Sequence, residues 1–212
     1  MKAKVIIAVA APILLAACVL GARTERLARD CADKVVKIGV VTKDSRGVGS
    51  GAFITRSGVI LTCYHVVNHD KIAKIYIKLE NGKVYRGALL AYDEKNDLAL
   101  VATEVSDVPY FKIGGEVKRG QEVAAFGSPL GLQHTASFGW VENFLKDGRI
   151  IHSAFINPGN SGGPLVDMKG RLVGINQFVI EMDIFHTAQG MGGAIPVSTI
   201  EKFLSTVAGV NK

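Results

Sequence analysis

The stretch N-P-G-N-S-G-G-P-L, residues 157–165, places three glycines and two prolines around a single serine. Glycine loses more conformational freedom on folding than any other residue, so this density indicates a backbone that must bend in an unusual way. A surface turn needs such a bend. A loop that aims several backbone N–H groups at one point needs it too. Ser161 lies at the centre of the stretch, and the rest of the chain decides between the two interpretations.

The bulk composition is that of a globular protein. The chain has 212 residues, 48% of them hydrophobic and 21% charged, with a formal net charge of +6. This length is enough for one or two domains with a substantial core. The positive residues are scattered and form no basic stripe, so the sequence favours no nucleic-acid partner. No motif calls for a cofactor.

The first 22 residues differ from the rest. A short basic start, M-K-A-K, precedes an uncharged apolar run over residues 5–22, which predicts a secretory signal or a membrane anchor. The segment Leu15-Ala16-Ala17-Cys18 resembles a bacterial lipobox, in which the cysteine is lipidated, although the apolar run continues past Cys18. A lipoprotein, an uncleaved anchor and a freely secreted protein therefore remain as alternatives. Each places the remaining chain outside the cytoplasm, and we expect a location in the cell envelope or periplasm with a tether to the membrane.

The remaining chain divides into a linker or short helix at 23–33 and two strand-rich units, at 34–108 and 109–212. The strand signals are runs rich in β-branched residues and an Asn-Gly pair between alternating runs at 81–82. About twelve short strand-like runs, at intervals of roughly 8–12 residues, predict an all-β fold. One helix is expected at the end, with Ser198 as its cap and Glu201 three residues later. Cys31 and Cys63 either form a disulfide or remain as two buried thiols.

Three polar residues in strand-to-turn contexts form the candidate catalytic set. His65 follows an apolar strand, Asp97 lies where a polar turn enters another, and Ser161 lies in the glycine-rich stretch. Each alone is typical of a structural residue. The order His, Asp, Ser along the chain is one of three orders known for a Ser-His-Asp triad, and it is the one found on an all-β fold. The hydroxyl of Ser161 would be the nucleophile, His65 its base, and Asp97 the group that orients the imidazole.

The chain resembles the trypsin-like serine proteases, specifically the HtrA/Deg branch. Seven segments carry the resemblance in the correct order: G-S-G-A-F-I-T, G-V-I-L-T-C-Y-H-V-V, K-N-D-L-A-L-V, A-F-G-S-P-L-G-L, I-N-P-G-N-S-G-G-P-L-V-D, G-R-L-V-G-I-N and G-A-I-P-V-S-T-I. It implies two six-stranded antiparallel β-barrels with a C-terminal helix and the triad in the cleft between the barrels. It also implies a serine endopeptidase that cleaves unfolded or flexible protein segments through an acyl-enzyme, with the backbone N–H groups of Gly159 and Ser161 as the oxyanion hole.

The resemblance also yields expectations about specificity. Phe155, six residues before the serine, would line the primary pocket together with Ile156 and Phe178, so cleavage after small or medium aliphatic residues is expected. The 176–178 segment, from Asn176 to Phe178, would pair with the substrate backbone as an added strand. The chain ends soon after the predicted helix, so no PDZ domain is expected.

H-V-V-N-H at 65–69 lacks the glutamate of a zinc-protease helix, so no metal site is predicted there. A catalytically silent peptide-binding module on the same fold remains the alternative to an enzyme, and the oligomeric state stays open.

Overall fold

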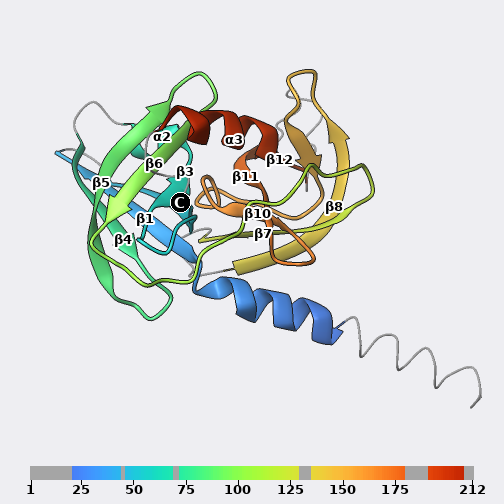
Figure 1. The fold of residues 1–212 in the computed structure, drawn as a ribbon, viewed down its shortest axis with the longest axis horizontal. Coiled ribbons are helices and arrows are strands. Elements are labelled where there is room, and N and C mark those ends of the chain that lie inside the picture. The colour runs from blue at the N-terminus through green and yellow to red at the C-terminus, as the bar shows by residue number, and fades with distance from the viewer. Residues whose placement is uncertain (1–20, 44–45, 69–71, 129–134, 180–190, 208–212) are drawn as a thin grey trace, which may run out of the picture.

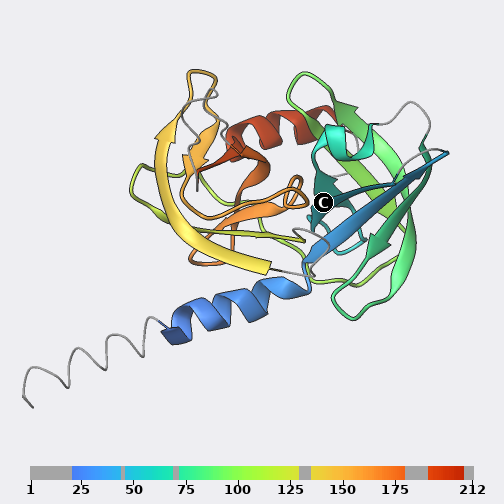
Figure 2. The ribbon, with the colours of Figure 1, turned by 180° about the vertical axis from the view of Figure 1, so that it is seen from behind.

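Two closed, six-stranded antiparallel β-barrels lie side by side in the computed structural model (Figures 1 and 2), which describes residues 21–43, 46–68, 72–128, 135–179 and 191–207. The strand order is β1-β2-β3-β6-β5-β4 in the first barrel and β10-β11-β12-β9-β8-β7 in the second. The fold expected from the sequence is therefore confirmed. Closure leaves no long strand edge unpaired, which removes the hazard of edge-to-edge aggregation.

Each barrel uses six consecutive strands of the chain. The first barrel contains β1 (Val35–Thr42), β2 (Arg46–Phe53), β3 (Ile60–Thr62), β4 (Ile72–Lys78), β5 (Val84–Asp93) and β6 (Leu98–Thr103). The second contains β7 (Glu122–Gly127), β8 (Thr135–Phe144), β9 (Ile150–His152), β10 (Pro164–Asp167), β11 (Leu172–Val179) and β12 (Gly192–Pro196). Two helices complete the labelled elements: α2 (Tyr64–Val67) and α3 (Val197–Thr206).

The strands form where the sequence alternates. In β1, the side chains of Val36, Ile38 and Val40 are buried, and the residues between them are partly exposed. This period of two matches a strand with one face on the core. The predicted Asn-Gly turn joins β4 to β5, and Gly82 has the positive φ of 82° that favours glycine.

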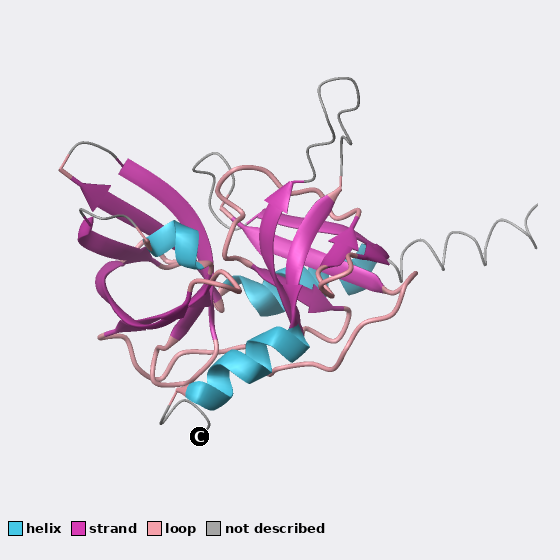
Figure 3. Ribbon diagram, turned by 90° about the horizontal axis from the view of Figure 1, so that it is seen from above, coloured by secondary structure: helices cyan, strands magenta, loops and turns pink. Residues whose placement is uncertain are grey.

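Hydrophobic packing joins the two barrels to each other. The larger core cluster fills the first barrel and continues into the second through Phe126 and Leu172, and into α3 through Ile200 and Phe203. Figure 3 shows the two barrels side by side, seen from above. Helix α3 contacts β11 and β12. It starts at Val197 after Pro196 with no side-chain cap, so the prediction that Ser198 caps it is wrong: Ser198 already lies inside the first turn.

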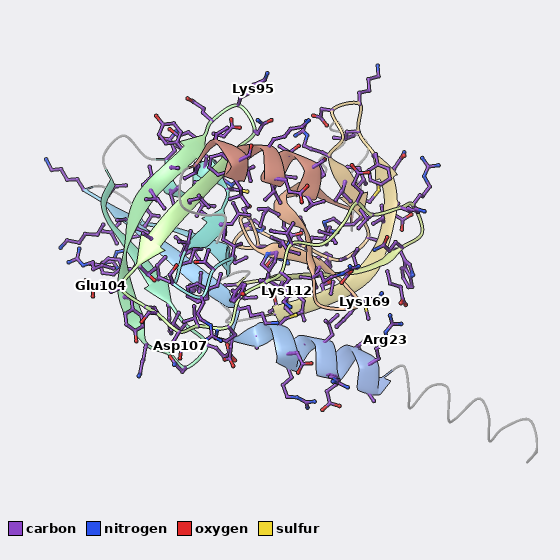
Figure 4. The ribbon with its side chains drawn as sticks, in the orientation of Figure 1. Arg23, Lys95, Glu104, Asp107, Lys112 and Lys169 are labelled. Carbon is purple, nitrogen blue, oxygen red and sulfur yellow. The ribbon has the colours of Figure 1, made fainter. Side chains whose placement is uncertain are left out.

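Residues 21–32 form a helix, which corrects the prediction of a linker at 23–33 in favour of its helical alternative. The helix is anchored because Leu27 and Cys31 are buried in the larger core cluster. Burial of one leucine side chain alone contributes about 1.5–3 kcal/mol. Arg23, labelled in Figure 4 below the barrels, forms an ion pair of 3.1 Å with Glu122 of β7.

The N-terminal predictions fall largely outside the described residues. Residues 1–20, including Cys18, lie there, so the signal, anchor and lipidation hypotheses remain predictions. Within the described part of the chain, no helix is both long enough and apolar enough to cross a bilayer. Cys31 and Cys63 are free, buried thiols, which decides between the two alternatives for this pair.

Candidate active site

His65 is presented by a short helix that the first barrel holds in place. Helix α2 follows β3, and Val66 and Val67 anchor it in the core. The N–H of Tyr64 donates to the carbonyl of Asp97 at 3.1 Å, which ties the helix to the turn before β6. With its neighbours buried, the His65 side chain stays 49% exposed. The backbone of His65 is therefore held in place, while part of its imidazole stays open to solvent.

Asp97, whose carboxylate contacts the imidazole of His65, lies in a turn with an unusual backbone conformation. Its φ is 55°, in the left-handed region that residues other than glycine seldom adopt, and such positions cluster at functional sites. One carboxylate oxygen accepts the backbone N–H of His65 at 2.8 Å, and the other lies 2.7 Å from His65 Nδ1. The first bond also satisfies an amide in the first turn of α2 that has no partner within the helix.

The charge of Asp97 is stabilised by these contacts. Burial by itself would raise the pKa of this carboxyl group, but hydrogen bonds from the His65 ring, the His65 backbone and Gln177 outweigh burial and lower it below its ordinary value. An ionised carboxylate can only accept hydrogen bonds, so the proton in the short contact belongs to His65 Nδ1. The Nε2 atom of neutral His65 then carries a lone pair, as a general base requires.

The Ser161 loop takes the bend that its glycines allow. Gly159 has a φ of 103° and Gly162 a φ of 85°, both in the region that favours glycine. A side chain at Gly162 would collide with the backbone of Ser50 and with the hydroxyl of Thr62. The loop is fixed from two sides, because Gly162 donates to the carbonyl of Asn176 at 2.8 Å and Ser50 donates to the carbonyl of Ser161 at 2.9 Å.

Two amides of this loop remain available. Asn160 N–H donates to the carbonyl of Asn157 at 2.9 Å, and Gly162 N–H is used as described above. Within the described chain, the N–H groups of Gly159 and Ser161 donate to no protein acceptor. The alternation of engaged and free amides leaves the N–H groups of Gly159 and Ser161, on either side of Asn160, without a protein acceptor among the described residues. A developing oxyanion needs two such donors.

The Ser161 hydroxyl points to β11. Its Oγ donates to the carbonyl of Gln177 at 3.1 Å, and among the described residues no hydrogen bond joins Ser161 to His65. The Gln177 side chain reaches the other way, and its Nε2 donates to Asp97 Oδ2 at 2.8 Å. Gln177 therefore contacts the carboxylate through its side chain and the serine through its backbone.

Sequence reasoning missed Gln177 and Ser50. Ser50 is fully buried; its hydroxyl donates to the carbonyl of Gly159 at 2.6 Å and accepts the N–H of Ser128 at 2.9 Å. It thereby connects β2 of the first barrel to the Ser161 loop and to the end of β7. The only sequence signal for Ser50 is its place between glycines in G-V-G-S-G, and Gln177 lies beside Asn176 in an apolar strand without any signal of its own.

The residues expected to bind substrate lie in different environments. Phe155 is 54% exposed and its N–H donates to Ser137 Oγ at 2.7 Å, whereas Ile156 is buried in the core of the second barrel. Phe178 belongs to β11, but its side chain lies outside the described residues. The pocket assigned to these three residues remains a prediction.

The expectation for Asn176 is wrong. This residue is fully buried, and its backbone is already engaged: its N–H donates to the carbonyl of Gly163 and its carbonyl accepts from Gly162, each at 2.8 Å. Neither group is free to pair with a substrate strand. Its side-chain amide donates to the carbonyl of Pro164 at 3.1 Å, so Asn176 positions the Ser161 loop.

The other histidines of the chain lie away from the His65 ring or outside the described residues. His152 is completely buried, and burial lowers its pKa to about 4. His69, His134 and His186 lie outside the described residues.

Comparisons with known proteins agree on one family of proteins. Residues 49–175 match the trypsin-like peptidase domain family. The rat protein named serine protease HTR4 is 36% identical over 171 residues, which is 74% of this chain and 33% of that protein. The mouse serine protease HTRA3 is 34% identical over 175 residues, 74% of this chain and 37% of its own length.

A bacterial relative and a solved structure complete the comparison. A protein of Hahella chejuensis named "Probable periplasmic serine endoprotease DegP-like" is 37% identical over 145 residues, 63% of this chain and 30% of that protein. The crystal structure of the serine endoprotease from Yersinia pestis superposes with a TM-score of 0.77 at 29% identity, covering 86% of this chain and 65% of the other. The chain thus spans 30 to 37% of the length of these three relatives, whose names agree with the HtrA/Deg branch expected from the motifs.

Proposed function

Because the chain belongs to the trypsin-like peptidase domain family, we propose that it is a serine endopeptidase whose triad consists of Ser161, His65 and Asp97. The observation that carries this proposal is the 2.7 Å contact between His65 Nδ1 and Asp97 Oδ2, which leaves Nε2 of the imidazole as a base on the exposed side of the ring. The two free amides beside Ser161 supply the second requirement, a place for the oxyanion.

The reaction begins with a small rotation of the Ser161 side chain. In the resting arrangement Ser161 Oγ donates to the Gln177 carbonyl. Exchange of that hydrogen bond for one to His65 Nε2 costs about 0.5–1.5 kcal/mol at most, the net value of a neutral hydrogen bond. Catalytic hydrogen bonds in resting enzymes are often absent or long and form when the substrate arrives. A peptide carbonyl bound beside Ser161 would favour rotation of the Ser161 hydroxyl toward His65.

The chemistry then follows from the three side chains. His65 accepts the Ser161 proton as Oγ attacks the peptide carbonyl, and Asp97 stabilises the resulting imidazolium. The N–H groups of Gly159 and Ser161 bind the oxyanion, and loss of one such donor costs roughly 3–4 kcal/mol of transition-state stabilisation. His65 returns the proton to the leaving amine, which leaves an acyl-enzyme on Ser161. Water, activated by the same imidazole, releases the second product.

The proposed substrates are unfolded or flexible segments of proteins. A peptide must be extended to place its carbonyl between His65 and the Ser161 loop, and folded domains seldom offer such a segment. The non-acidic Phe155 argues against cleavage after lysine or arginine. One relative is named a periplasmic endoprotease, and this supports the proposal of an envelope location with tethering through residues 1–22. A role in envelope protein quality control or processing is part of the same proposal.

One observation favours a second candidate, a catalytically silent peptide-binding module. The Ser161 hydroxyl bonds to Gln177 rather than to the base, and a chain locked in this state would bind peptides without cleaving them.

Labelling with a fluorophosphonate probe, followed by casein cleavage, separates the two candidates. The peptidase labels at Ser161 and degrades casein, and Ser161→Ala does neither. If the wild type and Ser161→Ala both stay unlabelled, the peptidase proposal is wrong. Labelling without casein cleavage would indicate an enzyme dedicated to one substrate.

A further inference from the structure

Cys63 lies beside the proposed catalytic pair and takes no part in the proposed mechanism. It is the residue between β3 and α2, it is completely buried, and its thiol donates to the carbonyl of Asn176 at 3.4 Å. One sulfur, one imidazole nitrogen and one carboxylate oxygen, from Cys63, His65 and Asp97, all lie within 4.8 Å of one another. These are the three donor types that zinc prefers in proteins.

We propose that Cys63, His65 and Asp97 form a binding site for a thiophilic divalent cation such as Zn²⁺, and that the bound ion switches the peptidase off. The switching part of this inference rests on the proposed function. The binding part rests on the side chains alone.

The geometry requires only small movements. Zinc bonds of 2.0–2.3 Å in a tetrahedron separate neighbouring ligand atoms by roughly 3.3–3.8 Å. His65 Nδ1 and Asp97 Oδ2, now 2.7 Å apart, would separate by less than about 1 Å. The sulfur lies within 4.8 Å of one ring nitrogen of His65 and one carboxylate oxygen of Asp97, and it would move inward by about 1 Å. Cys63 is completely buried, whereas the side chains of His65 and Asp97 are 49% and 17% exposed, so an ion must reach the sulfur past these two ligands.

The charges and protons of this exchange balance. A Cys63 thiolate and the Asp97 carboxylate together neutralise one divalent ion, with neutral His65 as the third ligand and water as the fourth. The ion replaces the proton between His65 and Asp97 and the proton of the thiol. The thiol proton goes to solvent, and the ring proton moves from Nδ1 to Nε2, so one proton is released for each ion bound.

Loss of the base follows from the same step. With the metal on Nδ1 and the proton on Nε2, His65 has no lone pair to accept the Ser161 proton. Asp97 is simultaneously diverted from stabilising an imidazolium. The ion therefore removes both functions of the pair without touching Ser161.

A neighbouring group already orients one of the ligands. Gln177 Nε2 donates to Asp97 Oδ2 at 2.8 Å. Partners of this kind in the shell around metal ligands tune affinity by about 10–100-fold. The hydrogen bond from the Cys63 thiol to the Asn176 carbonyl is lost when the thiol gives up its proton.

Cys31 is the matched control. It is also a buried free thiol, but it lies in the helix at 21–32, facing Gly170. Among the described residues, it belongs to no group of three potential metal ligands.

The binding test uses Co²⁺ as a spectroscopic substitute for Zn²⁺ in the Ser161→Ala protein, which does not need to be active. A thiolate-to-cobalt charge-transfer band should develop on titration and disappear when Zn²⁺ is added. The band should be lost with Cys63→Ala and kept with Cys31→Ala, both on the Ser161→Ala background. Circular dichroism verifies that each variant is folded, and Cys63→Ser replaces Cys63→Ala if the latter is not. A band that survives the Cys63 substitution, or no band at all, overturns the inference.

The switching test measures fluorophosphonate labelling rates at rising Zn²⁺, each divided by the rate of the same variant in chelator. Loss of Cys63 should raise the half-inhibitory Zn²⁺ concentration by at least about tenfold, the lower end of what changes even outside the ligand shell produce. Loss of Cys31 should leave it unchanged. Equal sensitivity of the wild type and the Cys63 variant refutes the switch. Absence of labelling in chelator alongside an intact cobalt band refutes the peptidase instead, and the metal site stands.

Discussion

Acidification should destabilise this protein in part through His152. The ring lies in β9 with no exposed surface, and within the described structure neither ring nitrogen has a hydrogen-bond partner of good geometry. Burial lowers its pKa from 6.5 to about 4, against weaker opposing effects of the Ala154 backbone and the Asn176 side chain. The folded protein therefore resists a proton that the unfolded chain accepts readily.

The sign and size of the change in unfolding free energy follow from the number of protons that the folded and unfolded states bind. Below pH 6.5 the unfolded state binds one more proton than the folded state, so stability falls as the pH falls, until the folded pKa near 4 is passed. At 1.36 kcal/mol per pKa unit, a difference of this size removes about 2 kcal/mol by pH 5 and about 3 kcal/mol by pH 4. This is a large part of the 5–15 kcal/mol that holds a typical domain together.

The assay is urea unfolding at several pH values between 7 and 4, with the wild type compared to His152→Leu. Leucine fills a similar volume and does not titrate, so the difference between the two proteins isolates the histidine from the carboxylates that also titrate in this range. The wild type should lose about 3 kcal/mol more than the variant between pH 7 and pH 4. Parallel losses in the two proteins, or an NMR titration of the His152 ring near 6.5, would refute the reasoning. In the second barrel, His152 pairs with Gly192 of β12.

Three substitutions test the site itself. Asp97→Asn should lower kcat by about 10⁴-fold with the fold intact, because the amide stabilises the wrong imidazole tautomer and no imidazolium; steady-state peptide hydrolysis measures it. Gly162→Ala should cost at least about 1–3 kcal/mol and prevent fluorophosphonate labelling, because its φ of 85° and its contact with Ser50 exclude a side chain; thermal unfolding measures the first effect. Ser50→Ala should cost about 1–3 kcal/mol, because the buried N–H of Ser128 loses its acceptor; urea unfolding measures it.

Two of these substitutions have a control variant, and all three have a result that would contradict the expectation. Gly82→Ala is the control for Gly162→Ala, because Gly82 also has a positive φ, of 82°, but open space around it, so it should retain labelling. Labelling of Gly162→Ala at the wild-type rate would show that the loop tolerates another bend. Thr55→Ala is the comparison for Ser50→Ala, because the Thr55 hydroxyl also accepts a backbone N–H, that of Val59, but within its own turn. Wild-type stability of Ser50→Ala would mean that water replaces the hydroxyl. Full activity of Asp97→Asn would remove Asp97 from the triad.

The sequence by itself determined the architecture and supplied the candidates for the reacting groups. Alternating apolar residues specify strands because a strand side chain points to one face or the other with a period of two, and this signal is local. The glycines at 159 and 162 indicated a backbone bend, because a residue without a side chain adopts such a conformation most readily. The motifs around His65, Asp97 and Ser161 then placed the groups on one known fold.

Only the tertiary structure decided how those groups are supported and what they face. Ser50 contacts Gly159 across 109 residues, Gln177 contacts Asp97 across 80, and Cys63 contacts Asn176 across 113. No periodicity encodes such pairs, because they arise where two closed barrels meet and not within one element. The same reason explains why Asn176, which looked available in its strand, is buried against the Ser161 loop. It also explains why the hydroxyl of Ser161 faces Gln177, and why a thiol lies beside the imidazole and the carboxylate.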